Sequence, residues 1–96
     1  MANQELKVLR IENCELPKLQ VMAIDTYLIQ NAGLKELRLK NVGLTQDLLK
    51  LLGGTIETSK SLLRLDLSVN ALKNGGAKEL AKIICRNKSL LGIDIT

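Results

Sequence analysis

The side chains that most often carry out catalysis are scarce in this chain of 96 residues. Histidine, the commonest general base near neutral pH, is absent. Asp66 and Asp94 form a carboxylate pair at equivalent positions, but we expect them on an open surface without a pocket to tune them for proton transfer. Redox Cys-x-x-Cys, phosphate-binding and nucleophile-elbow motifs are also missing. The sequence therefore predicts no enzyme, no cofactor and no metal site.

Charged residues two positions apart are better candidates for recognition chemistry. This spacing places side chains on one face of a β-strand. The eight candidates are Arg10, Glu12, Glu36, Arg38, Lys40, Arg64, Asp66 and Asp94. Such a face would bind another protein of complementary charge, with no small-molecule substrate.

A basic stripe is the second candidate surface. Lys78, Lys82 and Arg86 are spaced four residues apart, as side chains on one face of a helix are. The net charge of +4 allows an acidic partner or a nucleic acid there. Tyr27 is the only aromatic residue, so the stacking side chains of single-strand readers are missing and nucleic acid is the less favoured partner. The plainer interpretation is a solvated helix face.

The two cysteines bear on the cellular compartment. Cys14 and Cys85 lie far apart in a chain that shows no secretory segment in residues 1–15. No apolar run approaches the roughly 18 residues of a membrane span. We therefore expect a reducing, cytoplasmic location with both thiols free, and no membrane partner.

An internal repeat must position these residues. The first leucine of each unit recurs every 28 residues, at Leu6, Leu34, Leu62 and Leu90. The resulting units are 6–33, 34–61, 62–89 and a partial unit, 90–96. Stacking of such units buries apolar faces that one unit alone cannot bury.

Each unit reads L-x-x-L-x-L-x-x-(C/V/N)-x-L, most clearly in "LLRLDLSVNALKNGGAKELAKIICRNKSL". This pattern resembles the leucine-rich repeat family in its ribonuclease-inhibitor-like subclass, over essentially the whole chain. The resemblance implies a short right-handed α/β solenoid, with parallel strands on the concave face and helices on the convex face. It also implies a protein-interaction scaffold. The alternative is a regulatory segment of a GTPase-activating, ribonuclease-inhibiting or innate-immune sensor protein.

One position of the motif departs from the family. In family members, the Cys or Asn side chain at this position hydrogen-bonds backbone groups where the strand turns. The resemblance therefore gives Cys14 and Asn70 a structural role. Val42 occupies the same position in the second unit and has no group for such bonds.

Periodicity predicts the elements, because apolar spacing of two changes to about four within each unit. We expect strands near 8–12, 36–40, 64–68 and 92–95, and helices near 18–31, 46–58 and 75–87. The prediction is a single domain, 1–96. Since end units of such a stack need polar outer surfaces, we expect either a fragment of a longer array or self-association through uncapped ends.

Stacked strands would align the charged candidates in rows about 4.8 Å apart. One row contains Arg10, Arg38, Asp66 and Asp94, and another contains Glu12, Lys40, Ser68 and Thr96. Like charges on adjacent strands are destabilising, and Glu12 and Glu36 are placed to relieve Arg10 and Arg38. Our hypothesis is that these two arginines contact acidic side chains of the partner.

Overall fold

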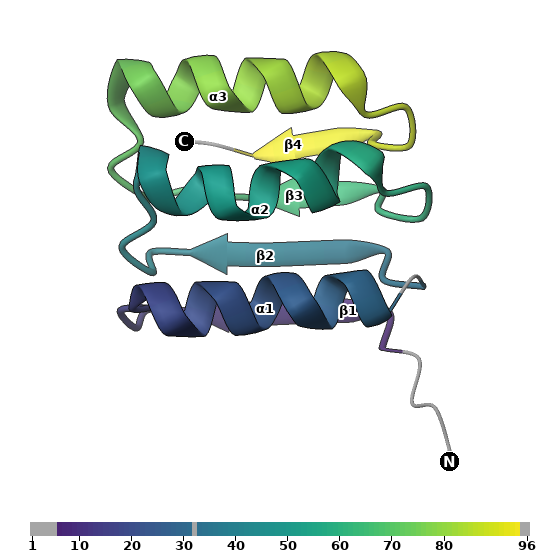
Figure 1. Ribbon diagram of the computed structural model, residues 1–96, viewed down its shortest axis with the longest axis horizontal. Coiled ribbons are helices and arrows are strands. Elements are labelled where there is room, and N and C mark those ends of the chain that lie inside the picture. Colours follow the sequence, from purple (N-terminus) through teal and green to yellow (C-terminus); the bar gives the residue numbers. More distant parts are fainter. Residues whose placement is uncertain (1–5, 32, 95–96) are drawn as a thin grey trace.

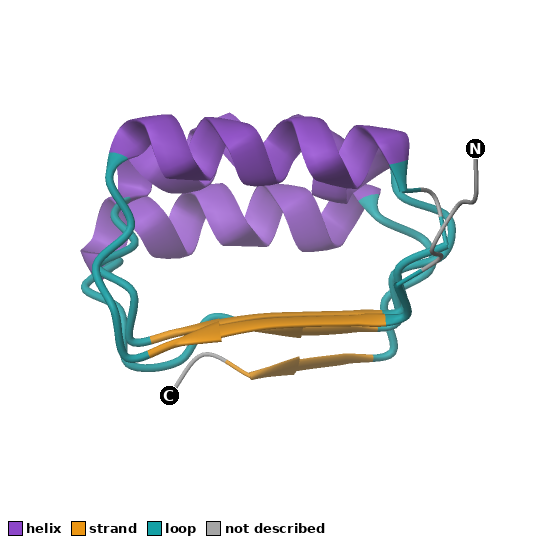
Figure 2. Ribbon diagram, turned by 90° about the horizontal axis from the view of Figure 1, so that it is seen from below, coloured by secondary structure: helices purple, strands orange, loops and turns teal. Residues whose placement is uncertain are grey.

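The structure is a computed structural model that describes residues 6–31 and 33–94. Strands and helices alternate along the chain (Figure 1). In order they are β1 (Val8–Glu12), α1 (Lys18–Gln30), β2 (Glu36–Lys40), α2 (Gln46–Thr58), β3 (Arg64–Asp66), α3 (Lys73–Arg86) and β4 (Gly92–Asp94). The strands form one parallel sheet in chain order, and the helices all cover the same face of it (Figure 2). The fold is therefore α/β in two layers, as the sequence predicted at that level.

The expected boundaries hold for β1, β2 and α2, and differ by one or two residues elsewhere. β3 ends at Asp66 instead of residue 68. The expected last residue of β4, 95, lies outside the described residues. α3 begins at Lys73 rather than 75, because Gly75 and Gly76 lie inside its first turn. A Cβ on Gly76 would stand 2.6 Å from Leu72 Cβ, so only glycine fits this close approach.

The leucines of the repeat form the core between the two layers. Paired strands keep the 28-residue register, with Leu9 beside Leu37, Leu37 beside Leu65 and Leu65 beside Ile93. Leu37 and Leu65 are completely or almost completely buried. Because successive strand side chains alternate between faces, this register sends the charged residues between the leucines to the opposite face.

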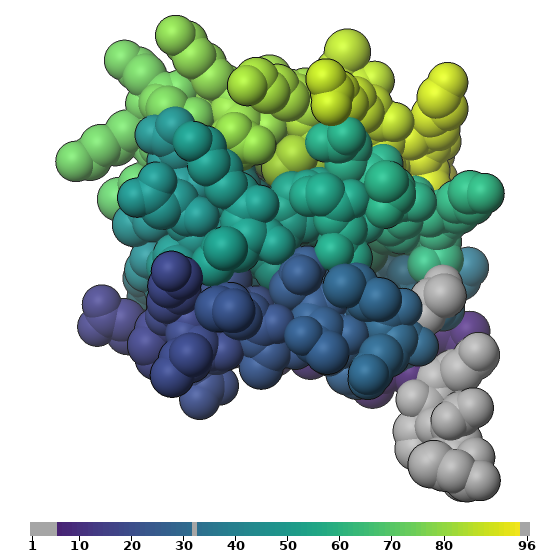
Figure 3. Space-filling model, viewed as in Figure 1, coloured from purple at the N-terminus to yellow at the C-terminus, as the bar shows by residue number. Residues whose placement is uncertain are grey.

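The helices lie side by side in chain order, as the bands of colour in the space-filling view show (Figure 3). Gly53 of α2 is buried against α3, where its missing side chain leaves room for Ile83. Between α1 and α2, Thr55 Oγ1 donates to Asp25 Oδ1 at 2.6 Å. These contacts fix the helix layer, which in turn holds the sheet.

In the turn after β2, another side chain makes the hydrogen bonds that the Val42 side chain cannot make. Asn70, one unit later, accepts hydrogen bonds from the N–H groups of Val42 and Leu44, both at 3.0 Å. Its Nδ2 donates to the carbonyls of Leu39 at 2.7 Å and Leu67 at 2.9 Å. The Val42 side chain is buried and has no polar group that needs a hydrogen bond. One asparagine therefore serves two neighbouring turns.

Candidate functional site

The face of the sheet opposite the helices is uncovered among the described residues (Figure 2). We call it the open sheet face. Its charged side chains are the eight predicted from the sequence: Arg10, Glu12, Glu36, Arg38, Lys40, Arg64, Asp66 and Asp94. The leucine register explains their common orientation, since each alternates with a core residue along its strand. The structure thus places all eight on one surface.

Strand pairing aligns the row that the sequence predicted. Arg10 is paired with Arg38, Arg38 with Asp66, and Asp66 with Asp94. Two arginines therefore do lie on adjacent strands, as do two aspartates. The other row is only partly as expected. Ser68 is only 3% exposed, so it offers almost no surface to a partner, and Thr96 lies outside the described residues.

Arg38 is the centre of the charged network. Its Nη1 lies 3.5 Å from Glu12 Oε2, its Nη2 lies 3.2 Å from Glu36 Oε2, and its Nε lies 3.5 Å from Asp66 Oδ2. Glu12 and Glu36, which were expected beside the two arginines, both contact Arg38, and Asp66 joins them from the next strand. One guanidinium thus links β1, β2 and β3 across the sheet.

The environment of Arg38 favours its charged form. Partial desolvation lowers the pKa of Arg38, but the hydrogen bond to Glu36 and the charges of Glu36, Asp66 and Glu12 outweigh it, so that the pKa lies above its usual value. The Nε atom itself is buried and has no hydrogen-bond partner in the described part of the chain, because its contact with Asp66 is electrostatic and poorly aligned. Arg38 is therefore held by charge from three sides.

Asp66 is fixed from its other side by Ser68. The backbone N–H and the Oγ of Ser68 donate to Asp66 Oδ1 at 2.9 Å and 2.6 Å. Desolvation raises the pKa of Asp66, but these hydrogen bonds and the charges of Arg38 and Lys40 prevail and lower it. This role of Ser68 was not predicted from the sequence, because the expected β3 ran through residue 68. The Asp-x-Ser spacing is a local signal that could have indicated it.

Arg10 and Arg64 differ from Arg38 on the same surface. Both are exposed, and neither forms an ion pair or side-chain hydrogen bond with any residue that the structure describes. They lie at opposite sides of the Arg38 network, on β1 and β3. A cation without an internal partner can accept an acidic group from another molecule without first breaking a bond.

A hollow of about 270 Å³ opens on the open sheet face beside Gly92. It exists because Gly92 has no side chain, and a Cβ built there would meet only Arg64 Cγ, at 3.9 Å. Its lining residues are Glu36, Arg38, Arg64, Leu65, Asp66, Gly92, Ile93 and Asp94. No sequence motif predicts this hollow, because it depends on which residues of the neighbouring strands surround Gly92 in the folded chain.

The predicted basic stripe lies on the helix layer, away from the sheet. Lys78, Lys82 and Arg86 are all exposed on α3. Arg86 Nη1 lies 3.2 Å from Glu57 Oε1 of α2, so this arginine ties the two helices together. The stripe is therefore a separate surface from the open sheet face.

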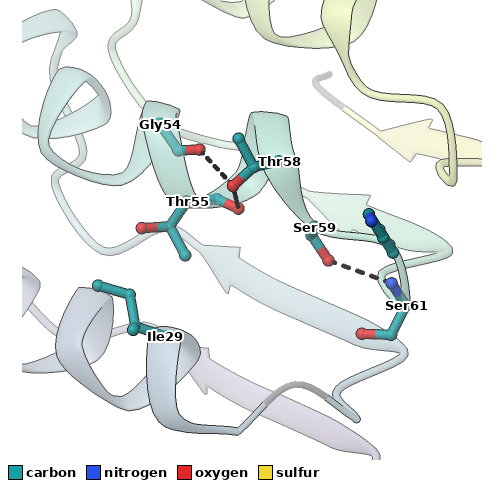
Figure 4. Close-up of a pocket in the computed structure, with 7 residues that line it drawn as sticks. Ile29, Gly54, Thr55, Thr58, Ser59 and Ser61 are labelled. Atoms are coloured by element: carbon teal, nitrogen blue, oxygen red, sulfur yellow. Dashed lines mark hydrogen bonds between the residues drawn. The ribbon is translucent and has the colours of Figure 1, made fainter.

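A larger hollow, of about 580 Å³, lies where α1 and α2 end (Figure 4). Its lining residues are Ile29, Gly54, Thr55, Thr58, Ser59, Lys60 and Ser61. Its hydroxyl groups are used within the chain. Thr58 Oγ1 donates to the carbonyl of Gly54 at 3.0 Å, and Ser59 Oγ accepts from the N–H of Ser61 at 3.4 Å. Despite its size, it offers less recognition chemistry than the open sheet face.

Cysteines and acidic groups offer no metal site in the part of the chain that the structure describes. Cys14 and Cys85 are free and exposed. Cys14 was expected to serve its turn as a structural thiol, but the turn is closed by backbone hydrogen bonds from Asn13 and Leu16 to the second unit.

None of the three helices described here is long and apolar enough to cross a membrane.

The chain resembles two solved structures in fold. One is a tropomodulin C-terminal domain from Caenorhabditis elegans, with a TM-score of 0.83 and 21% identity over 95% of this chain and 55% of that one. The other is described as leiomodin-1 actin-binding site 2, with a TM-score of 0.82 and 16% identity over 93% of this chain and 52% of that one. The chain thus spans about half the length of these proteins. No family model and no curated protein sequence matches it.

These findings correct the family assignment made from the sequence. The similar structures are a tropomodulin and a leiomodin domain. The assignment of this chain to the ribonuclease-inhibitor-like leucine-rich repeat proteins is therefore wrong. The physical reason is that a 28-residue leucine period specifies which side chains are buried in each strand and helix. It predicts register and layers, and it does not distinguish one family of α/β proteins from another.

Proposed function

We propose that this chain is a protein-binding domain that contacts its partner through the open sheet face. The observation that carries the proposal is the Arg38 network, in which three carboxylates from three strands hold one guanidinium. A charged surface fixed in this way loses little side-chain entropy on binding. None of the helices that the structure describes covers that face (Figure 2). The proposal assigns no catalytic step.

The charged residues divide into two groups in this proposal. Arg38 is a positioning residue, since its charge is already matched within the chain. Arg10 and Arg64 contact acidic side chains of the partner. Arg64 thus takes the contact role that the hypothesis from the sequence gave to Arg38, because Arg38 is already paired with three carboxylates. The face is also concave in this proposal, because helices pack about 8–10 Å apart whereas strands lie about 4.8 Å apart.

Actin is the first partner to test. The support is the fold likeness to a domain whose description names an actin-binding site. At 16% identity that likeness concerns the fold, so the binding residues of this chain must be tested directly. A cytoplasmic, reducing setting fits the two free, exposed thiols.

The test uses two variants with equal charge. Arg10→Gln/Arg64→Gln changes the open sheet face, and Lys78→Gln/Lys82→Gln changes the basic stripe. Each lowers the net charge of +4 by two. Binding is measured by cosedimentation with actin filaments and by fluorescence titration of monomeric actin. We expect the sheet variant to bind at least tenfold more weakly and the stripe variant to bind within about twofold of the wild type, since two buried charge contacts are each worth at least about 1 kcal/mol.

The reverse ranking would move the binding site to α3 and reject the open sheet face. Equal weakening of both variants would show that net charge, and no defined site, controls binding. If the unmodified chain binds neither filaments nor monomers, actin is excluded as the partner.

A further inference from the structure

A glycine opens the hollow on the open sheet face, although no steric contact within the described chain requires glycine there. Gly92 begins β4, lies beside Arg64 of β3 and does not have a positive φ. A Cβ on Gly92 would lie 3.9 Å from Arg64 Cγ, an ordinary van der Waals contact, whereas a Cβ on Gly76 would collide with Leu72. A glycine weakens a strand, and it often marks a place where a ligand approaches the backbone closely. The hollow is therefore a candidate site for a group from another molecule.

The charges around the hollow are mixed in sign. Two arginines, Arg38 and Arg64, line it together with three carboxylates. A carboxylate placed in the hollow would meet Glu36 and Asp66, and an ammonium or guanidinium group would meet Arg64. Because like charges repel at such short range, a charged occupant would be attracted by some lining groups and repelled by others. The lining therefore favours a neutral occupant that has positive and negative regions of its own.

An aromatic ring has this charge distribution, because its face is negative and its edge is positive. Arg64 is exposed and forms no ion pair or side-chain hydrogen bond with the residues that the structure describes, so its guanidinium is available to stack on the face of a ring. Gly92 presents bare backbone, against which aromatic side chains pack well in sheets. The volume of about 270 Å³ is below the usual range for small-molecule pockets, and so it suits a single side chain.

We propose that the hollow beside Gly92 receives one aromatic side chain of the protein partner, with tyrosine preferred. The inference rests on the proposed function, since it takes the open sheet face as the binding surface. Tyrosine is preferred because its hydroxyl can donate to a carboxylate. Glu36 Oε2 accepts from Arg38, whereas Glu36 Oε1 accepts no hydrogen bond from the described residues. The aromatic residue of this chain, Tyr27, belongs to α1 in the helix layer, so the ring comes from another molecule.

Arg64 can contact the ring and an acidic side chain of the partner at the same time. A guanidinium group is planar, so its face can stack on a ring while the N–H groups at its edge donate hydrogen bonds. Aromatic residues and arginine contribute most of the binding energy in many protein interfaces. The open sheet face supplies the arginines, and the partner supplies the aromatic residue.

A direct binding measurement tests the hollow without the partner. The probe is N-acetyl-L-tyrosinamide, which carries no charge, titrated into the isotope-labelled chain. NMR spectra follow the amides of Gly92 and Ile93 and the side-chain Nε–H of Arg64. We expect saturable shifts at these groups with a Kd of about 1–10 mM, as suits so small a ligand. N-acetyl-L-phenylalaninamide should bind about two- to tenfold more weakly for lack of the hydroxyl, and N-acetyl-L-leucinamide more weakly still.

Two variants locate the binding site. Gly92→Val fills the hollow, and we expect it to fold, because valine suits a strand and its Cβ fits without a clash. It should abolish saturable binding of the tyrosine probe. Arg64→Gln should weaken binding of both aromatic probes about two- to fivefold, the range of an exposed cation–π contact, and leave the leucine probe unchanged.

Gly54→Ala is the control, because Gly54 lines the other large hollow and a Cβ there also has open space. It should bind the tyrosine probe within about twofold of the unmodified chain. Circular dichroism melting checks that each variant is folded.

Three results would overturn the inference. Shifts that do not saturate, or that persist in the Gly92 variant, would show that the ring does not occupy the hollow. Equal binding of the leucine and tyrosine probes would show an apolar site without a preference for aromatic groups. Tighter binding of the amide of N-acetyl-lysine or of N-acetyl-aspartate would show an ionic site.

The outcome is distinguishable from that of the proposed function. If the tyrosine probe does not bind and Arg10→Gln/Arg64→Gln still weakens actin binding, the hollow is rejected and the open sheet face stands. If the probe binds the hollow and the basic-stripe variant alone weakens actin binding, the aromatic site stands and the open sheet face is rejected as the actin surface. With actin as the partner, Gly92→Val should weaken actin binding at least fivefold. Unchanged actin binding would exclude the hollow from that interface.

Discussion

At the scale of single residues, left-handed backbone recurs at one equivalent position in the turns after β1, β2 and β3. Asn13, Asn41 and Val69 have φ values of 59°, 54° and 58°, at equivalent positions of the repeat. Asparagine tolerates this conformation, whereas a β-branched residue is strained in it. Asn41 Nδ2 also donates to Asn13 Oδ1 at 2.9 Å, and Val69 cannot continue this chain of hydrogen bonds.

Val69→Asn should therefore raise the free energy of unfolding by about 1 kcal/mol, within the range of such backbone strain. Val69 is 55% exposed, so little packing is lost. Urea denaturation measures the change, which corresponds to about 4–8 °C in Tm for a chain of this size. Asn41→Val is the converse control and should destabilise. No gain in stability from Val69→Asn would mean that the turn is not strained.

Asp66 makes stability depend on pH in the acidic range. Its pKa is lower in the folded chain than in the unfolded chain, so the folded state prefers the carboxylate. This stabilisation is fully present above the unfolded pKa of about 3.9 and is lost as the pH falls through the lowered folded value. Asp66→Asn should therefore flatten the fall in unfolding free energy below about pH 4. An unchanged acid profile would contradict the network around Arg38.

A matched variant locates the cause of that shift. Ser68→Ala removes the hydroxyl that donates to Asp66 Oδ1 at 2.6 Å and leaves the backbone donor in place. It should raise the Asp66 pKa toward its ordinary value, as carboxyl chemical shifts in an NMR titration would show.

At the scale of elements, the turn after β2 depends on a side chain that lies 28 residues away. Asn70→Ala leaves the N–H groups of Val42 and Leu44 and the carbonyl of Leu39 without this partner. Since each unsatisfied buried group costs about 1–3 kcal/mol, we expect a loss of at least 3 kcal/mol in chemical denaturation. Asn74→Ala, an exposed position on α3, should change stability by less than about 0.5 kcal/mol. Similar small effects of both would mean that water replaces Asn70.

Two adjacent glycines in α2 allow the effects of helix propensity and of packing on stability to be measured separately. A Cβ on Gly54 meets nothing within 4 Å, so Gly54→Ala should stabilise by up to about 1 kcal/mol. A Cβ on Gly53 stands 3.4 Å from Ile83 Cδ1, so Gly53→Ala gains the same propensity but crowds α3. The Gly54 variant should therefore melt at the higher temperature. The opposite order would show that α2 and α3 are more loosely packed than their contact indicates.

The elements also show what sequence could predict. Leu37 and Leu65 had to be buried, and their period therefore predicted the strand register and the row of charges beside it. Ser68 was misplaced because its hydroxyl bonds to Asp66 and ends β3 early. The convergence of Glu12, Glu36 and Asp66 on Arg38 depends on side-chain rotamers, and only part of it followed from the spacing. The family could not be read from a burial pattern.

At the scale of the whole molecule, stability should be graded from the middle of the stack to its ends. Leu37 and Leu39 in β2 are fully buried, whereas Leu9 and Ile11 in β1 are only half-buried. Regions with fewer buried contacts open locally at lower free energy than the core does. Amide hydrogen exchange at low concentration should therefore be slowest in β2 and α2, and faster in β1 and β4. Uniform protection would mean that the four strands open as one unit.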